Sequence, residues 1–139
     1  MSSPLLDLDY ESRFRLAEVP MMAIRFPEFV PVRFNNGSYG FQGNLRSRSG
    51  ATYRIAIVLP QTTRVGASYP SVPAVVYVVE PRDLEPRVHV YNDGSLCLIH
   101  PLEWNPNFTV PTIIAMAAEW FANFEMFKST GTWPGPEIH

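Results

Sequence analysis

The chain holds a single cysteine, Cys97, in an apolar stretch that follows an Asn-Asp-Gly turn. Two histidines lie near it in sequence: His89 comes eight residues before the thiol and His100 three residues after it. A thiolate is a strong nucleophile toward acyl groups, and an imidazole can carry the proton or the charge that such a reaction needs. Cys97, His89 and His100 are therefore the candidate catalytic residues.

Each of these residues also has a plain structural interpretation. A lone cysteine among leucines and isoleucine is often an inert core residue. The turn at residues 92–94 argues against burial, because it predicts that Cys97 emerges at the start of a loop closed by Pro101. His89 can also be a half-exposed residue at a strand end. His100 is either a cation that lowers the thiol pKa or a solvated loop residue.

The composition bounds the protein class. With 139 residues, of which 46% are hydrophobic and 17% charged, the chain is expected to form one domain over residues 1–139. A net charge of −2 without blocks of one sign argues against nucleic acid and anionic membrane surfaces as partners. The histidines and the cysteine lack zinc-ligand spacing, and no glycine-rich phosphate loop is present. We therefore expect no metal and no cofactor.

The chain also lacks export signals. Acidic residues stand near the N-terminus where a signal peptide carries positive charge, and no apolar stretch is long enough for a membrane helix. One cysteine cannot form an internal disulfide. We expect a cytoplasmic protein with a reduced thiol.

Local patterns predict the elements that position the candidate residues. Ser3 and Pro4 predict the start of a short amphipathic helix, which should end before Pro20. Four segments rich in β-branched and aromatic residues follow, separated by turn signals, and they predict a four-stranded antiparallel meander. The predicted strands are residues 30–34, 39–47, 52–60 and 74–80.

A long helix should follow the cysteine segment. Thr109 is its expected N-cap, Pro111 falls in its first turn and Gly131 ends it. One apolar side of this helix should pack on the sheet, and it comprises Ile113, Ala117, Trp120, Phe124 and Phe127. The order of elements predicts an α+β domain with the candidate site in the loop between the last strand and the long helix.

Three motifs surround the cysteine in a fixed order: Tyr-Pro-Ser-Val-Pro at 69–73, Gly-Ser-Leu-Cys-Leu at 94–98 and Trp-Asn-Pro-Asn-Phe-Thr at 104–109. Together with the predicted strands and helix, they resemble the ubiquitin-conjugating enzyme family over roughly residues 39–128. One difference lies before the cysteine. Arg87, Val88 and His89 stand where the family has His-Pro-Asn, so that His89 takes the place of the asparagine.

The resemblance implies the ubiquitin-conjugating enzyme fold, with an N-terminal helix, the meander, an active-site loop and the C-terminal helix. It also implies a mechanism, in which Cys97 carries an activated C-terminal acyl group as a thioester and transfers it to an acceptor amine. His89 and His100 then become candidates to support that transfer, His89 by stabilising the oxyanion or holding the loop.

The C-terminal segment after residue 118 resembles that of stand-alone bacterial members found in anti-phage CBASS operons. This likeness implies a bacterial antiviral protein whose cargo is the C-terminus of a cGAS-like nucleotidyltransferase, with a ubiquitin-like protein as second choice. The expected partners are an activating enzyme acting in trans, if one is used, and an acceptor protein. The tail with Trp133 either packs beside the active loop or serves as a docking segment.

Two other functions stay open. The first is a catalytically inactive adaptor of the same fold, which the missing asparagine favours and the retained cysteine opposes. The second is a cysteine hydrolase that pairs Cys97 with His89 or His100. No residue that would orient the histidine can be assigned for it from the sequence.

Overall fold

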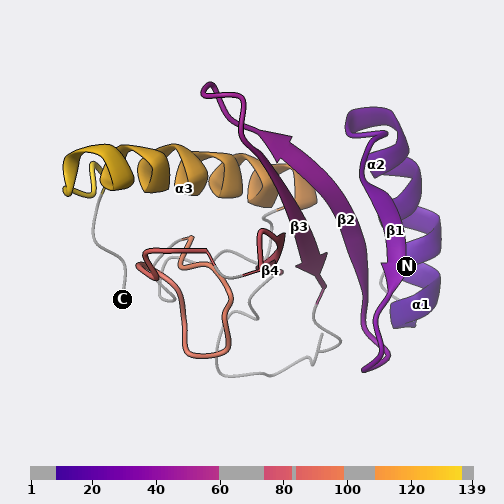
Figure 1. Ribbon diagram of the computed structural model, residues 1–139. Coiled ribbons are helices and arrows are strands. Elements are labelled where there is room, and N and C mark those ends of the chain that lie inside the picture. Colours follow the sequence, from indigo (N-terminus) through magenta and orange to yellow (C-terminus); the bar gives the residue numbers. More distant parts are fainter. Residues whose placement is uncertain (1–8, 60–73, 83, 99–108, 136–139) are drawn as a thin grey trace.

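The computed structural model describes residues 9–59, 74–82, 84–98 and 109–135. Within them a four-stranded antiparallel sheet packs its apolar face against both the N-terminal helical segment and the long C-terminal helix, which share one hydrophobic core (Figure 1). The long helix α3, Val110–Thr130, crosses one side of the sheet, and the N-terminal helices lie beside β1 at its other end. This arrangement agrees with the predicted α+β class and is compatible with a ubiquitin-conjugating enzyme fold.

The N-terminal helical segment consists of α1 Tyr10–Arg13, the π-helical turn η2 Phe14–Glu18 and α2 Val19–Arg25. Asp9 caps it by accepting a hydrogen bond from the Ser12 backbone N–H at 2.7 Å. The predicted end before Pro20 is wrong, because the proline follows directly after the π-helical turn and the backbone stays helical through Glu18 and Val19 into α2. The predicted start at Ser3 and Pro4 lies outside the described residues.

The four predicted strands are confirmed as β1 Val30–Arg33, β2 Tyr39–Arg46, β3 Thr52–Val58 and β4 Val75–Glu80, paired in that order. Their register aligns apolar residues across the sheet. Phe41 lies opposite Ile57, and Ile57 lies opposite Val76. All three side chains are completely buried, so this row forms the sheet side of the core.

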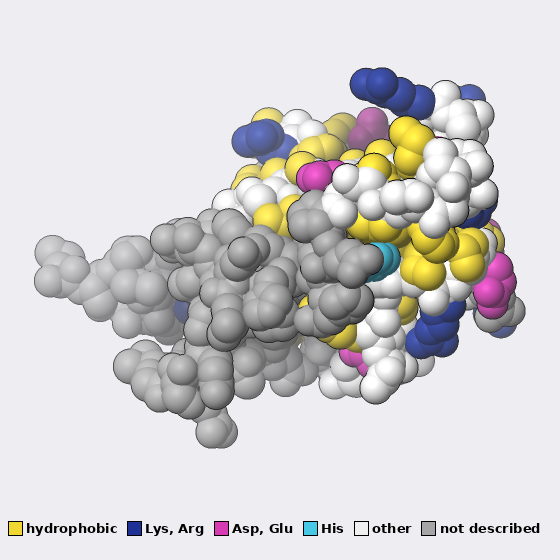
Figure 2. All heavy atoms as spheres, turned by 90° about the vertical axis from the view of Figure 1, so that its left-hand side faces the viewer, with side chains coloured by type: hydrophobic (Ala, Val, Ile, Leu, Met, Phe, Trp, Pro, Cys, Tyr) yellow, Lys and Arg dark blue, Asp and Glu magenta, His cyan; other side chains and the backbone are white. Residues whose placement is uncertain are grey.

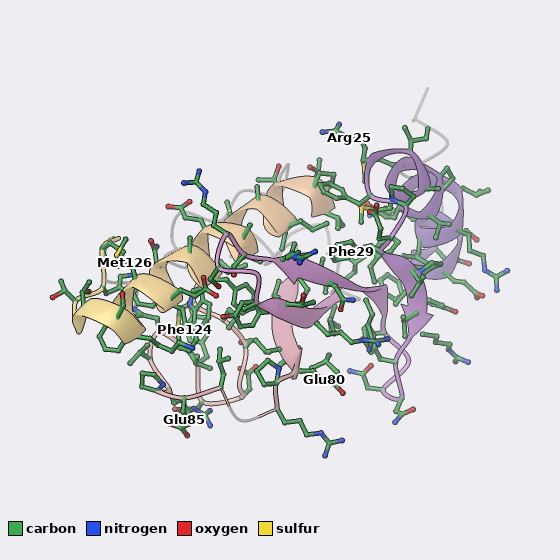
Figure 3. All side chains as sticks on the ribbon, turned by 45° about the horizontal axis from the view of Figure 1, so that its top comes forward. Arg25, Phe29, Glu80, Glu85, Phe124 and Met126 are labelled. Atoms are coloured by element: carbon green, nitrogen blue, oxygen red, sulfur yellow. The ribbon has the colours of Figure 1, made fainter. Side chains whose placement is uncertain are left out.

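Helix α3 forms the other side of the core and begins and ends where the sequence predicts. The Thr109 hydroxyl accepts a hydrogen bond from the Thr112 backbone N–H, and Gly131 ends the helix with a φ of 78°. Phe124 points inward and is completely buried, whereas Met126 points away and is half exposed (Figure 3). The predicted apolar side is confirmed for Ile113, Ala117, Trp120 and Phe124, which are buried, whereas Phe127 is only half-buried.

Candidate active site

The segment with the cysteine is attached to the edge of the sheet at β4. Ser95 forms a bridge with Tyr77, and the Leu96 backbone N–H donates to the carbonyl oxygen of Val76 at 2.9 Å. Cys97 therefore comes directly after two residues that are anchored to β4. The loop that follows it, residues 99–108, lies outside the described residues, and so does His100.

The Asn-Asp-Gly turn before the cysteine is confirmed. The Gly94 N–H donates to the Tyr91 carbonyl oxygen at 2.9 Å, with a φ of 92° at Gly94 that favours glycine. Asp93 accepts hydrogen bonds from the Ser95 backbone N–H at 2.9 Å and from the Ser95 hydroxyl at 2.6 Å, and these bonds lower the Asp93 pKa. A third bond, from the Tyr77 hydroxyl at 3.2 Å, ties the turn to β4.

Cys97 itself is buried, with only 4% of its surface exposed. The expectation that the turn brings this residue out of the core is therefore wrong. The reason lies in the backbone pairing on both sides of the segment. Leu96 is bonded to β4, and the Cys97 N–H donates to the carbonyl oxygen of His89 at 3.0 Å, so the chain is held between β4 and the His89 segment.

The surroundings of the thiol favour its neutral form. Burial raises the pKa of Cys97, the adjacent Tyr91 hydroxyl lowers it by stabilising the thiolate, and the negative charge of Asp93 raises it further. The net direction of the pKa is upward, so the site favours the neutral thiol over the thiolate. Any reaction that uses Cys97 must first remove the thiol proton.

Tyr91 is a site residue that sequence reasoning missed. Its hydroxyl oxygen is buried and has no hydrogen-bond partner of normal geometry within the described part of the chain. Burial raises its pKa, as does its interaction with Cys97. Because the turn reverses the chain, a residue six positions before the cysteine returns to it, and only a correct reading of that turn could have revealed the contact.

His89 has an unusual backbone conformation. Its φ of 51° lies in the left-handed region, where it is the only residue other than glycine among those described. Its carbonyl oxygen accepts two hydrogen bonds, from the Cys97 N–H at 3.0 Å and from the Trp120 indole N–H at 3.1 Å. His89 and Cys97, predicted as partners from sequence, are thus brought together through the backbone.

The His89 ring packs against the Trp133 ring in a tilted arrangement, with 4.1 Å between ring centroids and 32° between ring planes. Trp133 also contacts Trp120, at a centroid distance of 5.6 Å. The tail that carries Trp133 therefore packs beside the candidate site. Figure 2 views the molecule from the C-terminal end of α3. It shows His89, the one histidine among the described residues, beside hydrophobic side chains at the surface.

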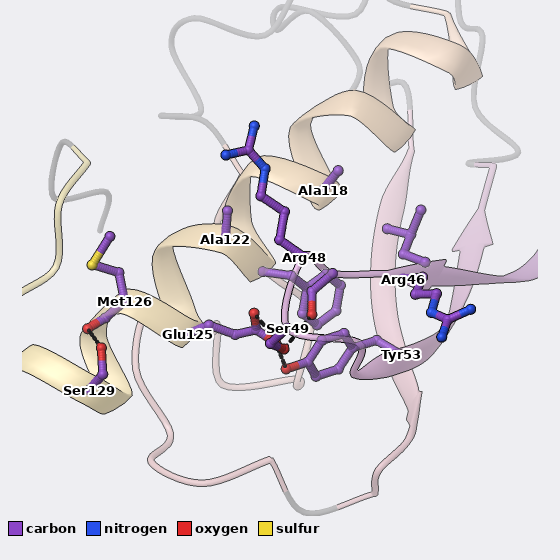
Figure 4. A pocket seen from close by; sticks show the side chains of 12 residues that line it. Arg46, Arg48, Ser49, Tyr53, Ala118, Ala122, Glu125, Met126 and Ser129 are labelled. Atoms are coloured by element: carbon purple, nitrogen blue, oxygen red, sulfur yellow. Dashed lines mark hydrogen bonds between the residues drawn. The ribbon is translucent and has the colours of Figure 1, made fainter.

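A cavity of about 620 Å³ lies elsewhere, between the β2–β3 hairpin and α3 (Figure 4). Ala118 and Ala122 of α3 line it, whereas Trp120 of the same helix faces His89, so the cavity and the candidate site lie on different sides of α3. At the cavity the Tyr53 hydroxyl donates to the Glu125 carboxylate at 2.6 Å. The Ser49 hydroxyl also donates to Glu125, at 3.1 Å, and the two bonds connect the β2–β3 hairpin to α3.

No three histidine, cysteine, aspartate or glutamate side chains in the described ranges lie close enough to hold a metal ion. None of the described helices is both long and apolar enough to cross a bilayer.

The chain matches the family described as Type II CBASS E2 protein over residues 18–139. The matched region includes the sheet, the Cys97 segment, α3 and the tail. No curated protein and no solved structure matches the chain significantly. The family match covers most of the sequence and confirms the relationship expected from the motifs: this chain belongs to the Type II CBASS E2 protein family.

Proposed function

We propose that the chain is a cysteine-dependent conjugating enzyme in which Cys97 is the acyl carrier. The observation that carries the proposal is the bond between the Cys97 N–H and the carbonyl oxygen of His89. It joins the only thiol of the chain to the residue at the position of the family's asparagine. Membership of the chain in the Type II CBASS E2 family supports an E2-like role for Cys97 and His89.

The proposed reaction has two steps. The Cys97 thiolate attacks the activated C-terminal carbonyl of the cargo, a C–S bond forms and the activating group leaves. An acceptor amine then attacks the thioester, a C–N bond forms, the C–S bond breaks, and the departing thiolate regains a proton. The second step passes through a tetrahedral oxyanion, which a well-placed hydrogen-bond donor stabilises by roughly 3 to 4 kcal/mol.

The thiolate must be generated inside a buried site. Burial holds the Cys97 pKa above its ordinary range, and the Tyr91 hydroxyl is the described group that opposes this effect. We assign Tyr91 the role of donating a hydrogen bond to the thiolate, both before attack and after its release. An activating enzyme acting in trans would supply the cargo in its activated form.

His89 supports the site mainly through its backbone. Its carbonyl oxygen is bonded to Cys97 and to Trp120, which favours the loop-support role over the oxyanion role. The Cys97 N–H already has a partner in this arrangement, so it is not free to bind the oxyanion.

The family membership supports our choice of cargo. By the resemblance to proteins of CBASS operons, the C-terminus of a cGAS-like nucleotidyltransferase is our first choice for the acyl group. A ubiquitin-like protein is the second choice. In either case the product is an amide bond to an acceptor protein.

An inactive adaptor is the second candidate function, and one observation favours it: the thiol is buried, and burial raises its pKa. Intact mass spectrometry of the protein purified from cells that express its whole operon separates the two. A conjugating enzyme carries a partner that a thiol reductant removes. An adaptor carries no covalent partner while its operon is active, and that result would rule out the proposed function.

A further inference from the structure

The tail after α3 turns back toward the candidate site through a defined set of contacts. Gly131 ends the helix in a left-handed conformation, and its N–H donates to the Phe127 carbonyl oxygen at 2.8 Å. The Thr130 hydroxyl then accepts a hydrogen bond from the Thr132 N–H at 3.1 Å. These bonds set the direction in which the chain leaves the helix. Trp133 consequently lies beside His89.

The tail runs close along α3 beyond this point. A Cβ atom placed on Gly135 would lie 2.7 Å from the Asn123 amide nitrogen and 3.4 Å from the Trp133 indole nitrogen. The Trp133 ring also contacts Phe127, at a centroid distance of 6.3 Å, in addition to Trp120. Trp133 is thus held by α3 on one side while its ring packs against His89 on the other.

His89 is a residue that needs such support. A left-handed φ is unfavourable for a side chain with a Cβ atom, and residues held there persist only when their surroundings fix them. Trp120 fixes the backbone by donating to the carbonyl oxygen, and Trp133 fixes the ring by packing against it. The Cys97 N–H depends on the same carbonyl oxygen for its hydrogen bond.

We propose that Trp133 is a positioning residue for Cys97. By packing against the His89 ring it keeps the His89 backbone in the left-handed conformation, and it thereby keeps the Cys97 N–H bonded and the thiol buried. The C-terminal tail is then part of the site, and it controls how accessible the Cys97 thiol is to a reagent or a cargo. Its consequence for acyl transfer rests on the proposed function, whereas its effect on thiol exposure does not.

Alkylation of the thiol by iodoacetamide tests the proposal, because the chain has one cysteine and intact mass reports its modification directly. Trp133→Ala should be alkylated roughly three to ten times faster than the wild type, the factor expected when one aromatic contact is lost. Trp133→Phe keeps an aromatic ring and should remain near the wild-type rate. Pro134→Ala, a change at the exposed neighbouring position, is the matched control and should react at the wild-type rate.

Two further measurements exclude a general loss of stability as the cause. Hydrogen exchange should accelerate at the Cys97 amide in Trp133→Ala and remain unchanged at the core residue Ile55 of β3. In a His89→Asn background, which lacks the ring but tolerates a left-handed φ, Trp133→Ala should add nothing. Independent effects of the two substitutions would contradict the proposal.

The outcome is separable from that of the proposed function. If no variant and no wild-type protein ever carries a covalent partner, the conjugating function fails while the alkylation result still decides the role of Trp133. If thioester formation is observed but Trp133→Ala leaves the alkylation rate and the Cys97 amide exchange unchanged, the positioning role is wrong.

Discussion

The Cys97 N–H and the Trp120 indole N–H donate to the same carbonyl oxygen, that of His89, at 3.0 and 3.1 Å. Helix α3 is therefore connected to the thiol segment through one backbone atom. Because this atom belongs to a residue with a left-handed φ, the position of Cys97 depends on a conformation that only its neighbours maintain. Several consequences of this arrangement can be measured.

The first concerns Tyr91. Its hydroxyl lowers the Cys97 pKa, so Tyr91→Phe should raise that pKa further above its ordinary range. Alkylation near neutral pH should become slower, and the midpoint of the rate against pH should shift upward. Tyr77→Phe is the control, because the Tyr77 hydroxyl donates to Asp93 and not to the thiol. A Tyr91→Phe protein that reacts faster near neutral pH would show that Tyr91 shields the thiol rather than activating it.

The second concerns the residue at position 89. His89→Ala removes the ring that packs on Trp133, while its Cβ atom stays in the same unfavourable left-handed region that the histidine occupies. His89→Asn tolerates that region. We expect both variants to become charged with cargo, and the alanine variant to discharge more slowly than the asparagine variant in single-turnover assays. Equal and wild-type discharge rates in both would remove His89 from the mechanism.

Arg87 gives a prediction about side reactions. Its guanidinium donates to the carbonyl oxygens of Tyr91 and Asn92, at 3.3 and 3.5 Å, and so lies beside the turn that precedes the thiol. A guanidinium stays protonated and does not attack a thioester, whereas a lysine amine can. Arg87→Lys should therefore produce a charged protein that acylates itself.

The measurement is the mass of the charged protein after treatment with reductant, since an amide resists reduction and a thioester does not. Arg15→Lys is the matched control, because Arg15 belongs to the N-terminal helical segment at the far end of the sheet (Figure 1). The predicted geometry would be contradicted if reductant-resistant adducts formed equally on Arg87→Lys and Arg15→Lys. It would also be contradicted if neither variant formed them.

The hairpin that packs on α3 gives a prediction about stability. Burial acts to raise the Glu125 pKa, but the hydroxyls of Tyr53, Ser47 and Ser49 lower it by more, so the net direction is downward. Tyr53→Phe should lower the free energy of unfolding by about 1 to 3 kcal/mol at neutral pH. A lowered carboxyl pKa stabilises the fold above the ordinary carboxyl pKa, and this contribution is lost as the pH falls through the lowered value.

Denaturant titrations at several pH values check this sign. The difference in unfolding free energy between wild type and Tyr53→Phe should be largest at neutral pH and shrink below about pH 4. A difference that is constant with pH would mean that the Tyr53 hydroxyl stabilises the fold independently of the charge on Glu125, since phenylalanine keeps the ring that stacks on Phe121 with 4.2 Å between ring centroids.

The elements of this fold could be predicted because local signals determine them. Alternation along β2, the cap at Thr109 and the stop at Gly131 each depend on residues that are neighbours in sequence. The N-terminal helix continues past its predicted end before Pro20, because the π-helical turn η2 directly precedes the proline and the backbone stays helical into α2.

The candidate site was predictable only in part. Cys97 and His89 follow from the motif order, but the burial of the thiol does not, because it results from pairing with Val76 and His89 across the fold. The roles of Tyr91, Trp120 and Trp133 likewise depend on contacts between segments far apart or reversed by a turn. No local pattern encodes such contacts.

The central claim, that Cys97 carries an acyl group, is tested most directly by Cys97→Ser. This variant replaces the thiol by a hydroxyl, and its ester with a cargo is far slower to transfer to amines than a thioester. Isolated from cells that express the whole operon, it should carry a partner that hydroxylamine removes and reductant does not, with the linkage mapped to residue 97, while Cys97→Ala carries none. No adduct on Cys97→Ser and none on the wild type, with the operon active, would contradict the account.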